Sequence, residues 1–414
     1  MNSVLRQSSL RSPGMMSAMP PSSELPSNRL VSIDAYRGTV MFLMLAEVLH
    51  LGGVAQALPD STFWKFLAFH QSHIPWIGCT LHDLIQPSFT MLVGVVLPFS
   101  LASRTQRGES TMTMTWHALL RSVLLVFLGI FLRSLGRDQT NFTFDDTLTQ
   151  IGLGYFFLFL LGRTNWKVQL TALIAILVGY WGLFAKYPLP GPEFDWSQAG
   201  VAADWEHHLK GFSAHWNKNT NPAWAFDGWW MNLFPRTEPF THSGGGYCTL
   251  SFIPTLGTML VGLLAGNWLK SERTPGRKIA GLLLGSAVCF GLALAAAHFD
   301  ICPIVKRIWT PSWVLFSGGW GLAILAGYYA IIDVAGWKAW AFPVIVIGSN
   351  SIVAYCSEWV LFSPIRAALD RHLGAQVFQL AGDAYEPLLH GFAVLLVVWL
   401  LLFWLYRRKI FVRI

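Results

Sequence analysis

The sequence predicts an all-α fold, a polytopic transmembrane helical bundle of about ten spans with one long extracytoplasmic loop. Hydrophobic residues occupy 53% of the 414 positions, and charged residues only 12%. Apolar runs of roughly 18 to 22 residues, the length that crosses the hydrocarbon core of a bilayer, recur along the chain. Together these observations predict an integral membrane protein whose partner is the lipid bilayer.

The predicted spans are bounded by charge clusters or by Pro, Gly, Asn and Asp, which interrupt apolar helices. They lie at 38–58, 81–102, 116–136, 147–162, 168–185, 249–269, 279–297, 312–332, 340–361 and 388–406. Residues 1–28 are rich in Ser, Pro and Met and lack an apolar run long enough for a signal peptide. We therefore expect a disordered cytoplasmic tail over 1–28 and a transmembrane domain over 29–414.

Lysines and arginines set the expected orientation, because cations in short connections resist translocation. With the N-terminus inside, every predicted inner connection contains a cation, for example Arg104, Arg163 and Lys338. An even number of spans then places both termini in the cytoplasm. This bias explains the net charge of +7 without a nucleic-acid partner.

The long connection over 186–248 is predicted to lie outside. It is dense in Trp, His, Gly, Pro and Asp, and its tryptophans include Trp205, Trp216 and Trp224. Such rings stack on sugars or lie in the membrane interface. The sequence leaves both interpretations open.

A polar cluster opens the first span with the pattern Arg29-x-x-Ser32-x-Asp34-x-x-Arg37-Gly38. Asp34 and Arg37 are three residues apart on a helix, so we expect them to share a face and to pair. An anchoring arginine with its partner is the structural alternative to a functional role. Further along the same span, Glu47 and His50 are also three residues apart. Because such side chains are costly in lipid, we expect them to face a polar cavity.

A second cluster opens the next span and reads His73-x-x-Trp76-x-Gly78-x-Thr80-x-x-Asp83-Leu84-x-x-Pro87. Its spacing of three and four residues places Thr80, Asp83 and Pro87 on one helical face. A lone His73 would be an interfacial imidazole bonded to a backbone carbonyl. Since Asp83 and Glu47 map to the same outer end, a catalytic site is the competing interpretation.

Further motifs follow in order: Thr249-x-Ser251-x-Ile253-Pro254, Ile308-Trp309-Thr310-Pro311-Ser312-Trp313, Ile332-Asp333-Val334 and Gly348-x-Asn350-Ser351-Ile352. With the two opening clusters they resemble the heparan-alpha-glucosaminide N-acetyltransferase family, including its bacterial relatives. The resemblance covers most of residues 29–361, and it depends on the combination of motifs in this order.

The resemblance implies transfer of an acetyl group from acetyl-CoA to the amine of a terminal glucosamine on the non-cytosolic side, in a bacterial inner membrane. The family's catalytic histidine corresponds to His73, which either takes a proton from the amine or accepts the acetyl group itself. By residue type, Asp83 would hold the imidazole, and Arg37, paired with Asp34, would bind the CoA phosphates. By residue type, Asn350 or Ser351 would donate to the oxyanion. The substrate-binding or supporting residues are expected to be Glu47, His50, Trp76, Thr80, Asn350 and Ser351.

Several alternatives stay open. The chain shows no recognised metal-ligand spacing, so acetyl-CoA is the only cofactor expected, as acyl donor. It departs from the family at Glu47, near which relatives commonly carry an asparagine, and at Gln150, where the arginine of their Leu-Gln-Arg pattern is missing, so different polar groups line the cavity. A sugar transporter with proton-coupling carboxylates and an O-acyltransferase of an envelope polysaccharide fit the same composition. A homodimer is an open alternative to a monomer.

Overall fold

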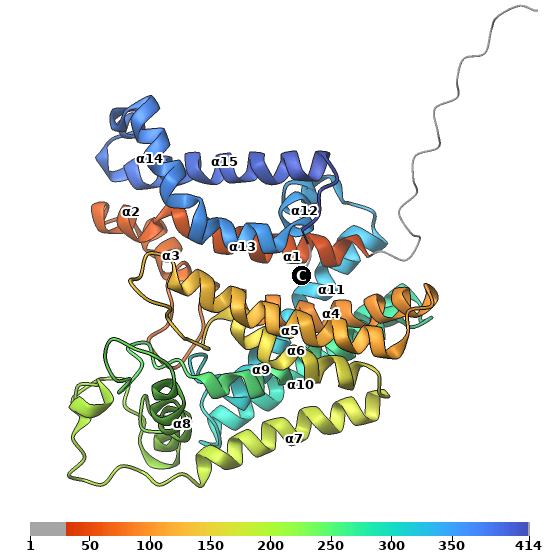
Figure 1. Cartoon of the computed structure of the whole chain (residues 1–414), viewed down its shortest axis with the longest axis vertical. Coiled ribbons are helices and arrows are strands. Elements are labelled where there is room, and N and C mark those ends of the chain that lie inside the picture. The colour runs from red at the N-terminus through yellow and green to blue at the C-terminus, as the bar shows by residue number, and fades with distance from the viewer. Residues whose placement is uncertain (1–29, 413–414) are drawn as a thin grey trace, which may run out of the picture. The chain divides into compact units, whose positions relative to one another are not determined.

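Residues 30–412 are described by a computed structural model of the chain, in which α-helices are joined by short 3-10 turns and loops (Figure 1). The predicted tail 1–28 and Arg29 lie outside the described residues. Within residues 30–412 there is no β-strand, and one isolated bridge pairs Ile77 with Val305. The predicted all-α class is confirmed.

The helices in chain order are α1 (Val31–Leu45), α2 (Leu51–Ala57), α3 (Thr62–His70), α4 (Ile85–Gln106), α5 (Thr111–Ser134), α6 (Thr147–Gly162), α7 (Trp166–Ala185), α8 (Pro222–Trp230), α9 (Phe252–Lys270), α10 (Pro275–His298), α11 (Pro311–Tyr328), α12 (Phe342–Ser349), α13 (Ser351–Val360), α14 (Phe362–Leu373) and α15 (Glu386–Arg407).

Each predicted span lies on a helix or on a pair of helices. Among the described residues, seven helical segments are long and apolar enough to cross a membrane, and two bent pairs raise the number to nine. The first bent pair joins Val31–Leu49 to Leu51–Ala57 at 40°, and the second joins Ala339–Ser349 to Ser351–Val360 at 68°. The remaining predicted span, 147–162, forms α6, which has only 16 residues. A polytopic helical bundle is therefore confirmed.

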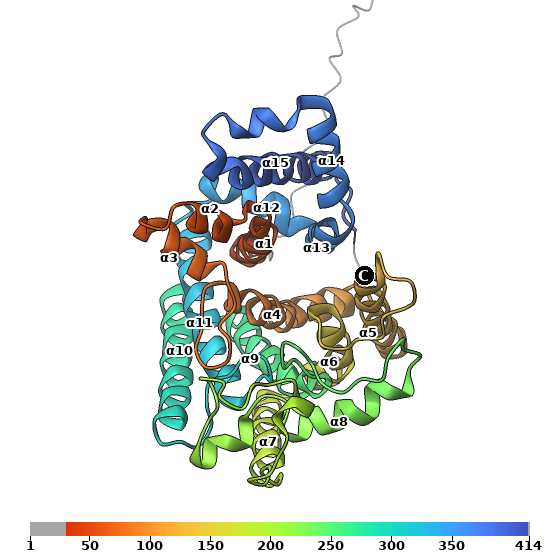
Figure 2. The same ribbon diagram turned by 90° about the vertical axis from the view of Figure 1, so that its left-hand side faces the viewer.

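Helix α9 occupies the centre of one group of helices, where it packs against α4, α6, α7 and α11 (Figure 2). In the most apolar stretch of α9, 78% of the residues are buried, whereas 22% are buried in that of α7 and 17% in that of α10. Helices α7 and α10 therefore present their apolar side chains to lipid, as expected of peripheral spans. Helix α1 packs against α12 on one side and α4 on the other.

Glycines allow the backbones of crossing helices to touch. Where α4 crosses α9, a side chain on Gly94 would overlap the carbonyl of Met259, and one on Gly262 would overlap the carbonyl of Met91. Gly38 of α1 approaches α12 in the same way. Small residues suit such crossings because helices in lipid associate through van der Waals packing rather than through the hydrophobic effect.

The bend between α12 and α13 is held by the C-terminal segment. The side-chain amide of Asn350 donates from Nδ2 to the carbonyl of Ile410 at 3.0 Å. Its Oδ1 accepts from the backbone N–H of Val412 at 2.9 Å. Asn350 is fully buried, and a buried side-chain amide without partners would be costly. These two hydrogen bonds satisfy it.

The α4–α9 crossing yields a stability prediction. Gly262→Ala should destabilise the folded protein by about 1–3 kcal/mol, because the backbone carbonyl of Met91 cannot move aside as a flexible side chain would. Thermal unfolding of the detergent-purified protein, monitored by fluorescence-detected gel filtration, measures the change.

The matched control for this crossing is Gly179→Ala in α7, where an added methyl group meets nothing within 4 Å. This variant should unfold at the wild-type temperature or slightly above it, since alanine is the better helix former. Equal effects of the two substitutions would contradict the close packing of α4 on α9.

Candidate functional site

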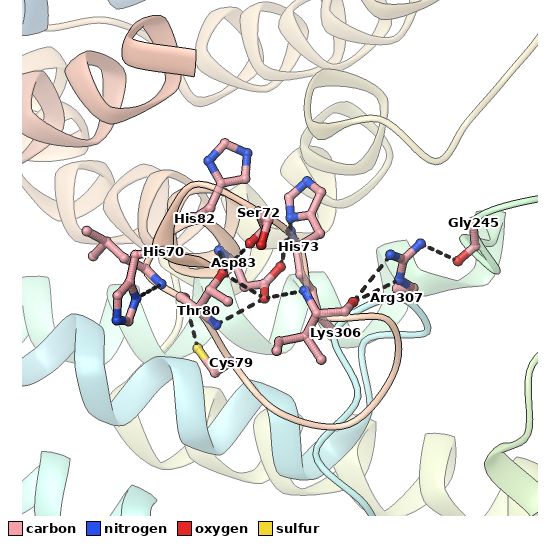
Figure 3. Close-up of polar contacts among 12 residues, drawn as sticks. His70, Ser72, His73, Cys79, Thr80, His82, Asp83, Gly245, Lys306 and Arg307 are labelled. Atoms are coloured by element: carbon pink, nitrogen blue, oxygen red, sulfur yellow. Dashed lines mark hydrogen bonds and ion pairs between the residues drawn. The ribbon is translucent and has the colours of Figure 1, made fainter. Parts of the chain in front are cut away.

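The centre of the candidate site is the carboxylate of Asp83, in the 3-10 turn His82–Leu84 that leads into α4 (Figure 3). Only 1% of Asp83 is exposed. Its Oδ2 accepts from the backbone N–H groups of Ile74 and Thr80 at 3.2 and 3.1 Å and from the Thr80 hydroxyl at 3.1 Å. The turn thus folds the preceding loop around the carboxylate. Thr80 and Asp83 do meet, but Thr80 lies in the loop before the turn, so the predicted helical face shared by Thr80, Asp83 and Pro87 is wrong.

His73 contacts the other oxygen of this carboxylate. Its Nδ1 lies 2.8 Å from Asp83 Oδ1 and 3.1 Å from the ammonium of Lys306. A nitrogen and a carboxylate oxygen approach to 2.8 Å only with a proton between them, so we assign the proton to Nδ1, and the approach of Lys306 to Nδ1 is then a contact rather than a hydrogen bond. The remaining ring nitrogen, Nε2, then carries a lone pair. Because the His73 side chain is 38% exposed, this lone pair is accessible from the adjoining cavity.

Lys306 completes a buried triad that the sequence did not predict. Its Nζ lies 3.1 Å from Asp83 Oδ1, and only 6% of the residue is exposed. Burial lowers the pKa of the Lys306 amine below its usual range, and the charge of Asp83 opposes that shift. Nothing in the sequence singled out Lys306 as a site residue. Lys306 and Asp83 are 223 positions apart in the sequence, and no local pattern indicates that they meet.

Three loops are joined around the triad. The Ile77–Val305 bridge aligns the loop before α4 with the loop before α11 and brings Lys306 to His73. The guanidinium of Arg307 donates to the carbonyl of Ile74 at 3.3 Å and to that of Gly245 at 2.7 Å (Figure 3). The loop that carries His73 is therefore tied to the segment that precedes α9.

A cavity of about 350 Å³ opens beside the triad. The ends of α1, α5 and α13 and the start of α6 contribute to its wall. Its polar lining residues are Glu47, His73, His82, Gln86, Arg133, Asp145, Asp146, Thr147, Tyr247, Lys306, Tyr355 and Glu358. Such a concave site with converging polar groups is the usual setting of a binding or catalytic centre.

His82 is a second histidine of the cavity that the sequence did not single out. Its ring centroid lies 4.5 Å from that of His73, and its Nε2 lies 3.7 Å from Glu47 Oε1. The prediction that Glu47 faces a polar cavity agrees with this placement. The sequence feature that could have indicated a role for His82 is its position between Thr80 and Asp83.

The structure does not bring every predicted residue to the cavity. His50 is exposed at the bend after α1, where its φ of 47° is left-handed. Trp76 is buried and donates to the carbonyl of Trp216 at 3.1 Å. Asn350 and Ser351 lie at the bend between α12 and α13, and the amide of Asn350 is bound to the C-terminal segment. These four residues lie outside the cavity lining, and so does Thr80, whose hydroxyl contacts Asp83.

The Asp34–Arg37 pair forms as expected. Arg37 Nη1 lies 3.4 Å from Asp34 Oδ1 near the start of α1. Glu47, by contrast, follows the end of α1, so the pair and the cavity lie toward opposite ends of this helix. Among the described residues, no group of three or more His, Cys, Asp or Glu side chains is arranged to hold a metal ion.

No family model matches the chain. The chain is 24% identical over 445 aligned residues to the human heparan-alpha-glucosaminide N-acetyltransferase, an alignment that covers 96% of the chain and 61% of that protein. It is 23% identical over 404 residues to the mouse protein of that name, with 87% and 58% covered. The chain thus spans about three fifths of the length of these curated relatives. It is a distant relative of these acetyltransferases and an integral membrane protein.

The buried triad predicts a specific loss of stability. Lys306→Met should destabilise the protein by about 3–5 kcal/mol, because it leaves the Asp83 charge buried without its cation. The double variant Asp83→Asn/Lys306→Met should be less destabilised than Lys306→Met alone, since neither charge is then buried. Thermal unfolding in detergent measures both.

The exposed Lys65 of α3 provides the control, and Lys65→Met should unfold at the wild-type temperature. Strictly additive effects of Asp83→Asn and Lys306→Met would show that the two side chains do not interact.

Proposed function

From this distant relationship and the triad, we propose that the chain is a membrane-bound acetyltransferase that moves an acetyl group from acetyl-CoA to the amine of a terminal glucosamine-like sugar. The observation that carries the proposal is the His73–Asp83–Lys306 contact set at the wall of a polar cavity. A histidine oriented by a buried carboxylate, with one ring nitrogen open to a cavity, is the arrangement that general-base catalysis requires.

In the proposed reaction His73 acts as the base. An amine attacks a thioester only when its nitrogen lone pair is free, so Nε2 of His73 removes the proton as the N–C bond forms. The C–S bond then breaks, and the proton passes to the leaving thiolate of CoA. Asp83 holds the proton on Nδ1 and stabilises the positive charge that the imidazole gains. Lys306 holds Asp83 in place.

The alternative within the same proposal is covalent catalysis. Nε2 of His73 would attack the thioester, release CoA, and carry the acetyl group until the sugar amine takes it. The same contact between His73 and Asp83 supports both routes. They differ in whether acetylated protein accumulates when acetyl-CoA is supplied without an acceptor.

The oxyanion needs a donor other than Asn350 or Ser351, because both lie away from the cavity. We assign this role to Arg133, whose side chain lines the cavity and whose guanidinium lies 4.6 Å from the ring centroid of Trp359. A fixed cation beside the reacting carbonyl stabilises the charge that develops in the transition state.

We retain Arg37 as the candidate for the CoA phosphates. It lies ten residues before Glu47, a separation of about 15 Å along a helix. With the N-terminus inside, Arg37 would face the cytoplasm, which supplies acetyl-CoA, and His73 would lie on the other side, in a bacterial inner membrane or its equivalent. The presence of at least one cation in every predicted inner connection supports this orientation.

The experiment that tests the function combines purified protein, radiolabelled acetyl-CoA and glucosamine. Wild-type protein should form N-acetylated sugar, and His73→Ala should lower the rate by about 10²–10⁴, the range expected for loss of a general base. His50→Ala is the matched control, because His50 is exposed and away from the cavity, and it should retain the wild-type rate.

Two outcomes would overturn the proposal. Sugar uptake by reconstituted vesicles without any acetylation would identify a transporter instead. Mass spectrometry that finds O-acetylated but no N-acetylated product in an acceptor screen would identify an O-acyltransferase. Acetylation of the protein in the absence of sugar, abolished by His73→Ala, would select the covalent route.

A further inference from the structure

A second cavity of about 130 Å³ adjoins the first. The two cavities share Asp145 and Tyr247 as wall residues. The second lies under the loop between α7 and α9, where α8 supplies Asp227 and the segment after α8 supplies Phe240 and Ser243. The two cavities are therefore neighbours on either side of Asp145 and Tyr247.

Asp227 is the unusual group in this cavity. Only 4% of the residue is exposed, and its Oδ2 accepts from the backbone N–H of Thr249 at 2.9 Å. Its Oδ1 is buried and has no hydrogen-bond partner among residues 30–412. Burial raises the pKa of Asp227 to about 6, and the hydrogen bonds from Thr249 oppose this shift. Because Oδ1 is buried without a partner, it is a costly acceptor until a ligand donates to it.

The other walls suit a sugar ring. Phe240 and Tyr247 supply aromatic surface for the apolar face of a pyranose, and Asn141 and Ser243 supply polar groups for its hydroxyls. Asp227 adds an acceptor for one hydroxyl. An aromatic platform beside a carboxylate and an amide is a combination that recognises the two chemically different faces of a carbohydrate.

The charges of both cavities restrict which sugar fits. In the cavity beside the triad, the carboxyl groups of Glu47, Asp145, Asp146 and Glu358 outnumber the cations Arg133 and Lys306, although burial raises the pKa of Asp146 above its usual range. In the second cavity, Asp145 and Asp227 face a single cation, Arg236. Its guanidinium already donates to the carbonyls of Met231 and Phe142. An acidic surplus favours amine-bearing or neutral units and disfavours a uronate.

We propose that Asp227 and the aromatic wall form an acceptor subsite for the sugar unit next to the reacting glucosamine, and that this subsite takes a neutral or amine-bearing unit rather than an acidic one. The proposal rests on the acetyltransferase function for the reaction at His73. It specifies the acceptor as an amino-sugar oligosaccharide without uronic acid. The binding part of the proposal can be measured without any reaction.

The kinetic test compares three acceptors on the full-length protein: glucosamine, a β-1,4-linked glucosamine disaccharide, and a disaccharide of glucosamine joined to a uronic acid. Wild-type protein should use the first disaccharide with kcat/KM about tenfold above the monosaccharide, the gain expected from one hydrogen bond to a charged group. It should use the uronate-containing disaccharide no better than the monosaccharide. Asp227→Asn should reduce the disaccharide preference to near one.

Asp204→Asn is the matched control, since Asp204 is an exposed carboxylate of the same loop, and it should keep the preference. Phe240→Ala is a second variant that tests the aromatic wall if Asp227→Asn does not purify as a folded protein. It should lose the preference as well. An unchanged preference in a folded Asp227→Asn or Phe240→Ala protein overturns the subsite, and preferred use of the uronate-containing disaccharide overturns its charge selectivity.

A binding measurement separates this proposal from the reaction. Calorimetry with His73→Ala protein, without acetyl-CoA, should show binding of the glucosamine disaccharide that Asp227→Asn weakens about tenfold. If this binding is found but wild-type protein never acetylates sugar, the acetyltransferase function is overturned and the subsite is retained. Acetylation without Asp227-dependent binding would remove the subsite and leave the function.

Discussion

The buried carboxylate of Asp83 is the group on which the rest of the site depends. It accepts five hydrogen bonds, four from His73, Ile74 and Thr80 of the loop before α4 and one from Lys306 of a distant loop. Burying such a charge costs several kcal/mol unless partners surround it, so the fold must bring Lys306 and His73 to the start of α4. The same contacts that compensate the charge also orient the imidazole. Stability and the geometry of the site therefore have one physical origin.

Hydropathy predicted the helices because the bilayer imposes length and apolarity on each span, and these are local properties of the sequence. The ten segments were found on this basis, although α6 is short and two spans are bent. The bends were not predicted. The α12–α13 bend depends on the amide of Asn350 meeting residues 410–412, a contact between distant parts of the chain.

The site was predicted in part for the same reason. His73, Thr80 and Asp83 lie within one short segment, so their spacing indicated that they act together. Lys306 comes from a loop more than two hundred residues away, and the Ile77–Val305 bridge and the hydrogen bonds from Arg307 to Ile74 place it. Residue type alone placed Asn350 at the oxyanion, but a buried amide satisfies backbone groups as readily as it binds a substrate. The polarity of a side chain indicates that it needs a partner when it is buried, but the fold determines which partner it contacts.

Because of the bend at Asn350, the two helices of the second bent pair, α12 and α13, lie in different surroundings. Helix α13 runs from Asn350 to the cavity, where Glu358 forms part of the wall. Eight residues separate them, about 12 Å along a helix. A fusion partner or a deletion at residues 410–412 therefore acts on the direction of α13 and on the shape of the cavity. Lost activity in such a protein would indicate a displaced wall rather than a missing catalytic group, so affinity tags belong elsewhere on the chain.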